Sequence, residues 1–374
     1  MNDLRTWIEV DKNIIKANIQ NIKSKISKEV ILLGVVKGNA LGLDTVQYSK
    51  LLESLGVEWL GITNIEDLIA IRENDVKIPI LLLCEESGSE WVSLGLRHDL
   101  RFTLYTKETC RLISTEAKAL GLAARVHVKI NTGLNRIGID PDQVISLVEY
   151  ISSLSNIDIE GAFTQFSPAH DINKKKLLEE FEVFKEVINR LSELNIKIPI
   201  CHVATTPSLL LLAESHLDMV RVGIGINGLY PSNEYTDLIN IKYPMTWKTR
   251  VGYIRRVNAN TNVGYDNAYI TEKNTCIATI QVGISDGLSA RMAKNRGFVL
   301  INSKKYPVVA ISMNHSMVDI GDYEESNVKI GDEVVLIGKQ GNAYIHPEEQ
   351  AQQIDCYVEE ILSHINRSIS RIYL

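Results

Sequence analysis

The chain has 374 residues, of which 23% are charged and 45% hydrophobic, the composition of an ordinary soluble globular protein with two domains or one large barrel plus an appendage. The formal net charge of −6 gives no reason to expect a nucleic-acid or membrane partner. We find neither a signal-peptide pattern nor an apolar run of membrane-spanning length. Five scattered cysteines, none in Cys-x-x-Cys spacing, argue against a disulfide framework or a metal site and for a reducing cytoplasm.

The first part of the chain alternates between strands and helices. A short strand at 6–10 and a helix at 12–26 precede strand-then-helix units that recur about every 25–35 residues. Eight strands are expected, at 30–36, 59–62, 78–83, 101–104, 125–130, 158–163, 200–203 and 219–224. The helices expected between them include 64–74, 106–120, 141–154, 174–194 and 207–214. Because the strands are apolar throughout rather than alternating, the sequence predicts a parallel (β/α)8 barrel of the TIM type.

The pattern changes near 231–240, where short strand-like runs separated by turn signals replace the alternation. These runs lie at 246–257, 275–282, 297–301, 306–312 and 333–337. They predict a mostly antiparallel β domain, so we divide the chain into a barrel at 1–240 and a C-terminal β domain at 241–374. The first strand, at about 6–10, could pack with the second domain.

Lys37 follows directly after the first apolar strand of the barrel. A lysine at the end of a buried strand is costly unless it has a partner or a chemical role, and a desolvated amine can form a Schiff base. The alternative is a lysine that extends to solvent where the strand meets the loop. Active sites of such barrels lie where the strands end, which favours the chemical role.

Other strand ends carry groups suited to an anionic ligand. Arg136 follows the fifth strand across a glycine turn and could capture a carboxylate or phosphate, although it could also be a surface arginine. The seventh and eighth strands end near Thr205, Thr206 and Gly223, where barrels commonly bind phosphate; the threonines are also ordinary helix N-cap residues. His202 taken alone is more typical of a hydrogen-bonded strand-end histidine. A Schiff-base lysine and a phosphate pocket at one rim indicate pyridoxal phosphate.

At this point several motifs match a known family. They are Val-Val-Lys-Gly-Asn-Ala-x-Gly at 35–42, Lys-Ile-Asn-Thr-Gly-Leu-Asn-Arg-Ile-Gly at 129–138, Val-Arg-Val-Gly-Ile at 220–224, Val-Gly-Tyr at 263–265, Gly-Ile-Ser-Asp-Gly-Leu at 283–288 and Ser-Met-Asn at 312–314. Each is weak alone, but their order and spacing are specific. The chain resembles the alanine racemase family, the fold-type III pyridoxal-phosphate enzymes, along nearly its whole length.

The resemblance implies a two-base racemase of alanine or a related small amino acid, working as a homodimer with shared active sites. Lys37 would hold the cofactor and act as one base, and Tyr265 from the other subunit would be the base on the opposite face. Two bases on opposite sides of Cα exchange its proton without moving the substrate.

The resemblance also assigns the residues around the cofactor and substrate. Arg221 would contact the pyridine nitrogen, and the phosphate would be held by Thr206, Gly223 and Ile224. His202 lies on the same cofactor-binding strand ends. The substrate carboxylate would meet Arg136 and, from the other subunit, Met313, and Lys129 corresponds to the family's carbamylated lysine.

The chain departs from the family pattern at several pocket positions. Leu41 and Leu43 replace the usual tyrosine and histidine, Gln165 replaces the histidine at the cofactor ring, and Asn314 replaces an aspartate. The tyrosine that the family uses at the phosphate falls on Tyr357 or on Glu359, depending on the alignment. These changes leave two interpretations: drift within alanine racemases, or a pocket for another amino acid such as serine.

Three other functions share parts of this pattern. A fold-type III decarboxylase would carry a glutamate at the pyridine nitrogen, and a non-catalytic pyridoxal-phosphate carrier generally lacks the second domain. Neither feature is found here. A catalytically impaired homologue that still binds the cofactor is the remaining alternative, because the phosphate pocket has lost at least one hydrogen-bonding residue.

Overall fold

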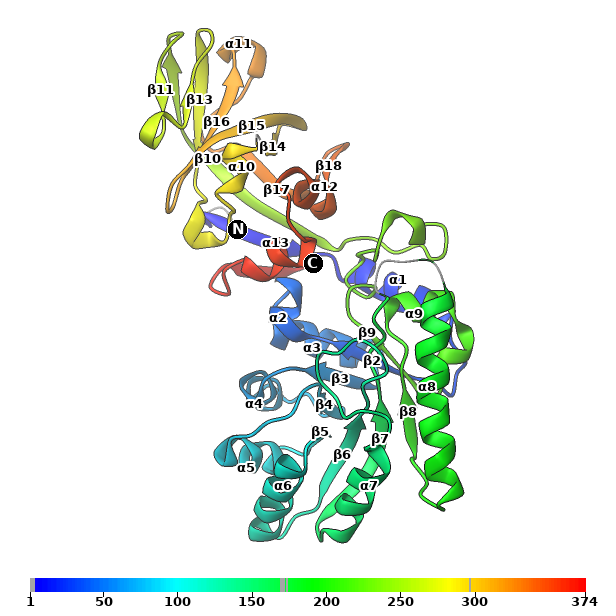
Figure 1. Ribbon diagram of the computed structural model, residues 1–374. Helices are drawn as coiled ribbons and strands as arrows, with labels where there is room; N and C mark the ends of the chain where they lie inside the picture. Colours follow the sequence, from blue (N-terminus) through cyan, green and yellow to red (C-terminus); the bar gives the residue numbers. More distant parts are fainter. Residues whose placement is uncertain (1–3, 169–171, 173, 296) are drawn as a thin grey trace. The chain divides into compact units, whose positions relative to one another are not determined.

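The computed structural model describes residues 4–168, 172, 174–295 and 297–374. The chain forms two compact units (Figure 1). One contains Ile14–Lys37 and Thr45–Lys242, and the other contains Met1–Asn13, Gly38–Asp44 and Tyr243–Leu374. In the described part of the chain, no helix has both the length and the apolar character needed to cross a membrane.

The first unit is a parallel barrel of eight strands in the order β8-β7-β6-β5-β4-β3-β2-β9. Backbone hydrogen bonds from Asp218 to Cys201 and from Arg221 to Ala204 link β9 to the chain at β8, so the sheet closes on itself. The strands are β2 (Ile31–Val35), β3 (Trp59–Ile62), β4 (Ile80–Leu82), β5 (Leu100–Leu104), β6 (Ala124–Lys129), β7 (Ile157–Phe163), β8 (Ile200–His202) and β9 (Met219–Val222). The predicted fold class is confirmed, and all eight predicted strands have ends within two residues of the observed ones.

Helices cover the outer side of these strands (Figure 1). They are α1 (Lys12–Lys23), α3 (Thr45–Ser54), α4 (Ile65–Glu73), α5 (Ser89–Arg97), α6 (Lys107–Leu120), α7 (Val144–Ser153), α8 (Lys174–Glu193) and α9 (Thr206–Leu211). Three predicted helix ends were wrong. The first helix stops at Lys23, α7 begins after a turn at 141–143, and a 3-10 turn over Ala213–Ser215 replaces the end of the helix expected to reach Glu214.

The second unit is built on a nine-stranded sheet in the order β18-β17-β14-β15-β16-β13-β10-β1-β19. Its strands are β1 (Thr6–Val10), β10 (Met245–Val257), β13 (Thr275–Ile280), β14 (Phe298–Ile301), β15 (Lys304–Ile311), β16 (Ser316–Gly321), β17 (Glu333–Gln340), β18 (Ala343–Ile345) and β19 (Ser370–Tyr373). β1 pairs antiparallel with β10 and parallel with β19. The predicted mostly antiparallel sheet is confirmed, with every other pairing antiparallel among the described strands of this unit.

Several elements of this unit were not predicted. A two-stranded ribbon joins β11 (Asn262–Val263) to β12 (Tyr269–Ile270), and short helices occur at α10 (Arg291–Lys294), α11 (Tyr323–Ser326), α12 (Pro347–Gln353) and α13 (Val358–His364). Strand β16 was also missed, although its buried residues alternate as in a strand with one packed face.

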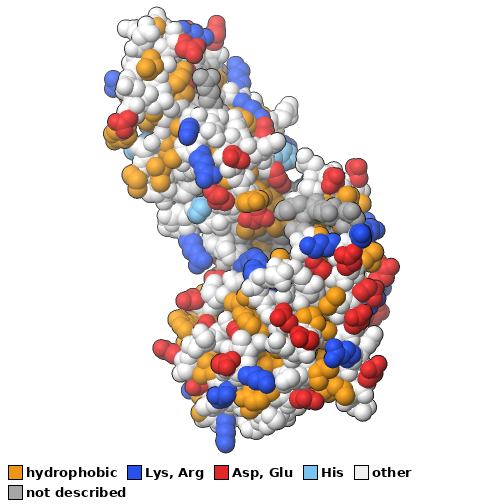
Figure 2. Space-filling model, viewed as in Figure 1, with side chains coloured by type: hydrophobic (Ala, Val, Ile, Leu, Met, Phe, Trp, Pro, Cys, Tyr) orange, Lys and Arg blue, Asp and Glu red, His pale blue; other side chains and the backbone are white. Residues whose placement is uncertain are grey.

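On the face seen in Figure 2, acidic and basic side chains are interspersed.

Candidate functional site

Lys37 lies immediately beyond β2, where Val36 is buried and donates its N–H to the carbonyl of Gly61. The lysine side chain itself is exposed. Lys37 begins the short element α2 (Lys37–Leu41), whose other four residues are left-handed, with φ of 63° at Gly38, 54° at Asn39, 51° at Ala40 and 53° at Leu41. This conformation costs about 1–2 kcal/mol for each residue that has a Cβ atom, so the surrounding structure must impose it.

The chain's C-terminal strand holds the segment that follows this turn. Arg371 Nε donates to the carbonyl of Gly42 at 3.0 Å, and the Tyr373 hydroxyl donates to the carbonyl of Leu43 at 2.6 Å. A Cβ atom at Gly42 would lie only 3.0 Å from the carbonyl oxygen of Leu362, and φ is 88° there, so the position favours glycine. The Leu43 side chain is buried in the core, an environment that suits an apolar residue.

The ends of β8 and β9 bring two predicted phosphate contacts together. Thr205 is the N-cap of α9, its N–H donating to Ser208 Oγ at 2.8 Å, so Thr206 is the first helical residue. Thr206 Oγ1 accepts the N–H of Gly225 at 3.3 Å, which joins the helix start to the loop after β9. In that loop Gly223 lies against Val35 of β2, since its Cβ would be 3.4 Å from the Val35 side chain. The phosphate contacts and the strand that carries Lys37 are therefore neighbours.

Arg221 on β9 is the buried cation at the centre of this region, with 3% of its surface exposed. Its Nη1 donates to Nδ1 and to the carbonyl of His202, each at 2.9 Å, and its Nη2 donates to the carbonyl of Thr164 at 2.7 Å. Burial lowers the pKa of Arg221 to about 9, so the guanidinium stays protonated at neutral pH. Gln165 Oε1 is a further acceptor at 3.4 Å from Nη2.

Two histidines continue this network through the barrel interior. His202 Nε2 lies 2.8 Å from His127 Nδ1, and His127 Nε2 lies 3.2 Å from Glu160 Oε2. Since arginine only donates, His202 Nδ1 accepts, which places the His202 proton on Nε2 and the His127 proton on Nε2. In every hydrogen bond between Arg221 and the Glu160 carboxylate, the donor is then on the Arg221 side and the acceptor on the Glu160 side. Glu160 is in turn paired with Arg101 at 3.2 Å.

Burial keeps both rings neutral. Desolvation lowers the pKa of His127 and lowers that of His202 further, and the neighbouring arginines add to both effects. The His202 ring stacks on Phe163 at 4.8 Å with 7° between the planes. No Cβ fits at Gly161, where it would lie 2.3 Å from His127 Nδ1. His127, Glu160 and Arg101 were not predicted as part of the site, although polar residues within otherwise apolar barrel strands were a visible signal.

Lys129 at the end of β6 is a second buried amine, with 4% of its surface exposed. Desolvation, followed by the charges of Arg221 and Arg136, lowers its pKa to about 7. Its Nζ donates to the carbonyl of Leu83 at 3.3 Å and lies over the Phe163 ring. Because about half of such amines are neutral at pH 7, Lys129 can act as a nucleophile.

Arg136 is exposed in the loop after β6, close enough to Lys129 to affect its charge. That loop depends on Gly133, where a Cβ would lie 2.5 Å from the buried carboxylate of Glu180. The same carboxylate accepts the N–H of Ser167 at 2.8 Å and so ties the loop after β7 to α8. The structure thus gathers the predicted barrel residues at the strand ends.

The remaining predicted residues belong to the second unit and are highly exposed. Tyr265, in a 3-10 turn after β11, is 77% exposed; Met313 is 60% exposed and Tyr357 is 75% exposed. The Tyr265 hydroxyl has no hydrogen bond to any described residue. Within the described ranges no group of three or more His, Cys, Asp or Glu could hold a metal ion, and all five cysteines are free thiols.

Residues 10–231 match the N-terminal domain of alanine racemase, and residues 244–373 match its C-terminal domain. The chain belongs to the alanine racemase family. The resemblance found in the motifs is confirmed, and with it the assignment to the isomerases.

Individual members of the alanine racemase family agree with this assignment. An alanine racemase of Halothermothrix orenii is 34% identical over 369 residues, which cover 98% of this chain and 96% of that protein. The alanine racemase structure of Clostridium difficile 630 superposes with a TM-score of 0.93 at 32% identity, covering 100% of this chain and 96% of that one. A Bartonella henselae alanine racemase structure with covalently bound pyridoxal phosphate shares the fold, with a TM-score of 0.86 at 22% identity, covering 99% and 100%. The alternatives of a racemase for another amino acid and of an impaired homologue are not favoured.

Proposed function

We propose that this protein is a pyridoxal-phosphate-dependent racemase that interconverts L- and D-alanine in the cytoplasm. The observation that carries the proposal is the grouping, at one end of a full-length family barrel, of Lys37 beyond β2 with Thr206, Gly223 and Arg221 at the ends of β8 and β9. Five free thiols support a reducing compartment.

The residues present fit the cofactor. A Cβ at Gly225 would lie 2.9 Å from the Thr206 side chain, so glycine lets the loop after β9 come close to the start of α9. The Thr206 hydroxyl and the backbone N–H groups of this loop would hold the phosphate there. Arg221 donates hydrogen bonds from Nη1 and Nη2 to protein acceptors. Its Nε–H donates to no described residue and would donate to the pyridine nitrogen. Lys37 would hold the cofactor covalently, with Ile224, His202, Gln165 and either Tyr357 or Glu359 completing its surroundings. Once bound, pyridoxal phosphate supplies an electron sink for charge that develops on Cα.

The protein's own part in the reaction is to position the substrate and move protons. The α-carboxylate would be held by Arg136 of the same chain and by Met313 of the partner subunit, which fixes Cα between two bases. Lys37 Nζ would take or give the α-proton on one face, and the hydroxyl of Tyr265 of the partner subunit would do so on the other.

A shared active site requires a homodimer. Its support is the high exposure of Tyr265 and Met313, since large apolar side chains exposed to this degree are commonly covered by a partner. The proposal is therefore a symmetric dimer in which each chain supplies Tyr265 and Met313 to the barrel of the other.

The purified protein with added pyridoxal phosphate is expected to racemise alanine at least about tenfold faster than serine and other small amino acids, because a pocket of fixed size separates substrates by roughly this factor per added group. The measurement is chiral product analysis together with exchange of the α-proton in deuterated water. Exchange without inversion, release of carbon dioxide, or faster turnover of serine would each contradict the proposal.

Lys129 is expected to carry a carbamate, as in the family. A neutral amine attacks the carbon of carbon dioxide, forms an N–C bond and releases one proton to solvent, which leaves a carbamate anion. Lys129 has its pKa lowered to about 7 beside two arginines that favour this anion. With 13C-labelled bicarbonate, a carbamate carbon resonance should be visible at pH 8 and fade as the pH falls through about 7. Lys129→Gln should lack the resonance, and Lys16→Gln, an exposed helix lysine, should keep it. A resonance that persists in Lys129→Gln would refute the assignment.

A further inference from the structure

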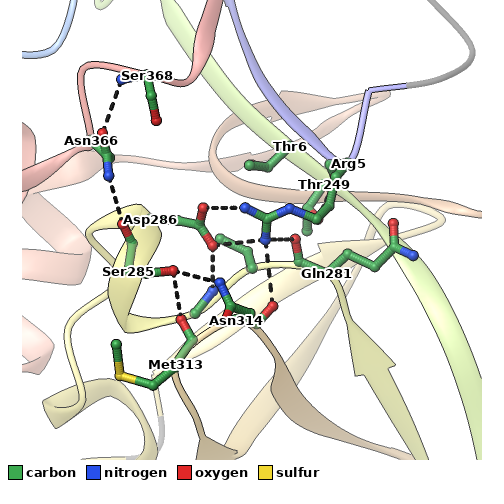
Figure 3. Close-up of polar contacts among 12 residues, drawn as sticks. Arg5, Thr6, Thr249, Gln281, Ser285, Asp286, Met313, Asn314, Asn366 and Ser368 are labelled. Carbon is green, nitrogen blue, oxygen red and sulfur yellow. Dashed lines mark hydrogen bonds and ion pairs between the residues drawn. The ribbon is translucent and has the colours of Figure 1, made fainter.

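We propose that Arg5 and Asp286 are positioning residues for the substrate: their ion pair fixes the turn that presents the Met313 peptide N–H to the α-carboxylate. The inference rests on the proposed function, in which Met313 of the partner subunit lies at the substrate. All residues that carry it belong to the second unit, and Figure 3 shows their contacts.

The first observation is the direction of the peptide groups at 312–314. The carbonyl of Ser312 accepts the N–H of Ile284 at 3.1 Å, and the carbonyl of Met313 accepts both the N–H and the Oγ of Ser285, each at 2.9 Å. In a trans peptide, the C=O of one residue and the N–H of the next point in opposite directions. The N–H groups of Met313 and Asn314 therefore point away from the 283–287 turn.

Those outward N–H groups are available to a ligand. Neither the Met313 nor the Asn314 N–H has a hydrogen-bond partner among the residues that the structure describes, and both residues are exposed. Met313 and Asn314 link β15 to β16, so the turn would move if the contacts on its carbonyl side were lost. Its orientation depends on the 283–287 turn.

The second observation is how the 283–287 turn is held. Asp286 is buried, with 4% of its surface exposed, and its Oδ2 accepts the N–H of Gly283 at 2.9 Å. Arg5 binds both carboxylate oxygens, with Nη1–Oδ2 at 2.9 Å and Nη2–Oδ1 at 2.5 Å. Arg5 Nη1 also donates to the carbonyl of Gln281 at 2.9 Å and lies 3.5 Å from that of Asn314. One guanidinium thus reaches both turns.

The two turns are packed too closely to adjust independently. A Cβ at Gly283 would lie 2.4 Å from the Ser312 carbonyl oxygen, which brings the two turns into direct contact. On its other side the 283–287 turn packs against the end of α13, since a Cβ at Gly287 would lie 2.2 Å from the His364 carbonyl oxygen. Asn314 Nδ2 donates to Ser285 Oγ at 2.8 Å and closes the network on its other side. A shift of the Asp286 carboxylate is therefore passed to Met313 through rigid backbone contacts.

Arg5→Met keeps the aliphatic stem but removes the guanidinium. It is expected to raise KM for alanine about tenfold, roughly the loss of one well-placed hydrogen bond to a charged group, while kcat changes less than about threefold. The inhibition constant of propanoate, which has the carboxylate alone, should rise by the same factor, and that of ethylamine, which lacks it, should not change. Arg5→Lys keeps the charge beside Asp286 and should give intermediate values.

Ser285→Ala is a milder second variant, because it loses one of the two bonds to the Met313 carbonyl; its KM should rise by about threefold. Lys305→Met is the control, since it removes a different, exposed ion pair of this unit, Lys305–Glu349 at 2.6 Å, and should leave every constant unchanged. Unchanged KM and propanoate inhibition in Arg5→Met and Ser285→Ala, or a loss confined to kcat, would overturn the inference. If the wild-type protein fails to racemise alanine, that result contradicts the proposed function itself and not the role of the Arg5–Asp286 pair.

Discussion

Neither Lys37→Ala nor Tyr265→Phe should racemise alanine at more than about a thousandth of the wild-type rate, because each removes one of two positioned bases. Mixed in equal amounts with subunit exchange, the two inactive proteins should recover about a quarter of the wild-type rate. Half of the dimers then pair one variant with the other. In each such dimer one site contains both intact residues and the other contains neither.

The complementation experiment needs controls at residues of the same types. Lys16→Ala and Tyr253→Phe alter exposed side chains outside the proposed site and should keep wild-type activity. Recovery in the mixture would support a site built from two chains. If the mixture stays inactive although mass spectrometry detects mixed dimers, both bases belong to one chain or one of them is wrongly assigned.

His127→Ala is expected to lower the free energy of unfolding by about 3–5 kcal/mol. The variant leaves a cavity in a fully buried position, removes the partner of the His202 Nε2–H and removes one partner of the Glu160 carboxylate. A buried cavity and a buried unpaired donor are among the largest losses that single substitutions cause.

Urea unfolding of the cofactor-free protein measures this change, with His364→Ala as the control because His364 is exposed. The control should stay within about 0.5 kcal/mol of wild type. A loss below about 1 kcal/mol in His127→Ala would mean that the histidine network is not part of what holds the barrel together.

The barrel could be predicted from the sequence because its strands are continuous apolar runs, such as 59–62, between helical stretches. Lys37 and Arg221 were identifiable because motifs fix their position at strand ends. The later sheet was harder to predict, since β16 carries Asp319 and ends in glycine and so departs from the composition of a strand.

Two features of the site had no local signal. Nothing in the residue types predicts a left-handed conformation at Ala40 and Leu41, and the segment that follows them is held by hydrogen bonds from the distant C-terminal strand to Gly42 and Leu43. The Arg5–Asp286 ion pair joins residues 281 positions apart, and only the folded sheet brings them together. The roles assigned to Tyr265 and Met313 stay predictions, because they depend on a second chain. The phosphate contact assigned to Tyr357 or Glu359 stays a prediction as well.

The hydrogen bonds that run from Arg221 through His202 and His127 to Glu160 make the stability of the fold sensitive to acid. Each imidazole is a donor on one side and an acceptor on the other, so a proton added to His202 or His127 would leave two N–H groups facing each other. The unfolded chain has no such restriction and binds a proton at each ring below about pH 6.5. Because the pKa values of both rings are lowered in the folded protein, the unfolded chain takes up two more protons at this pair than the folded chain does. The free energy of unfolding should therefore fall steeply as the pH drops below about 6.5.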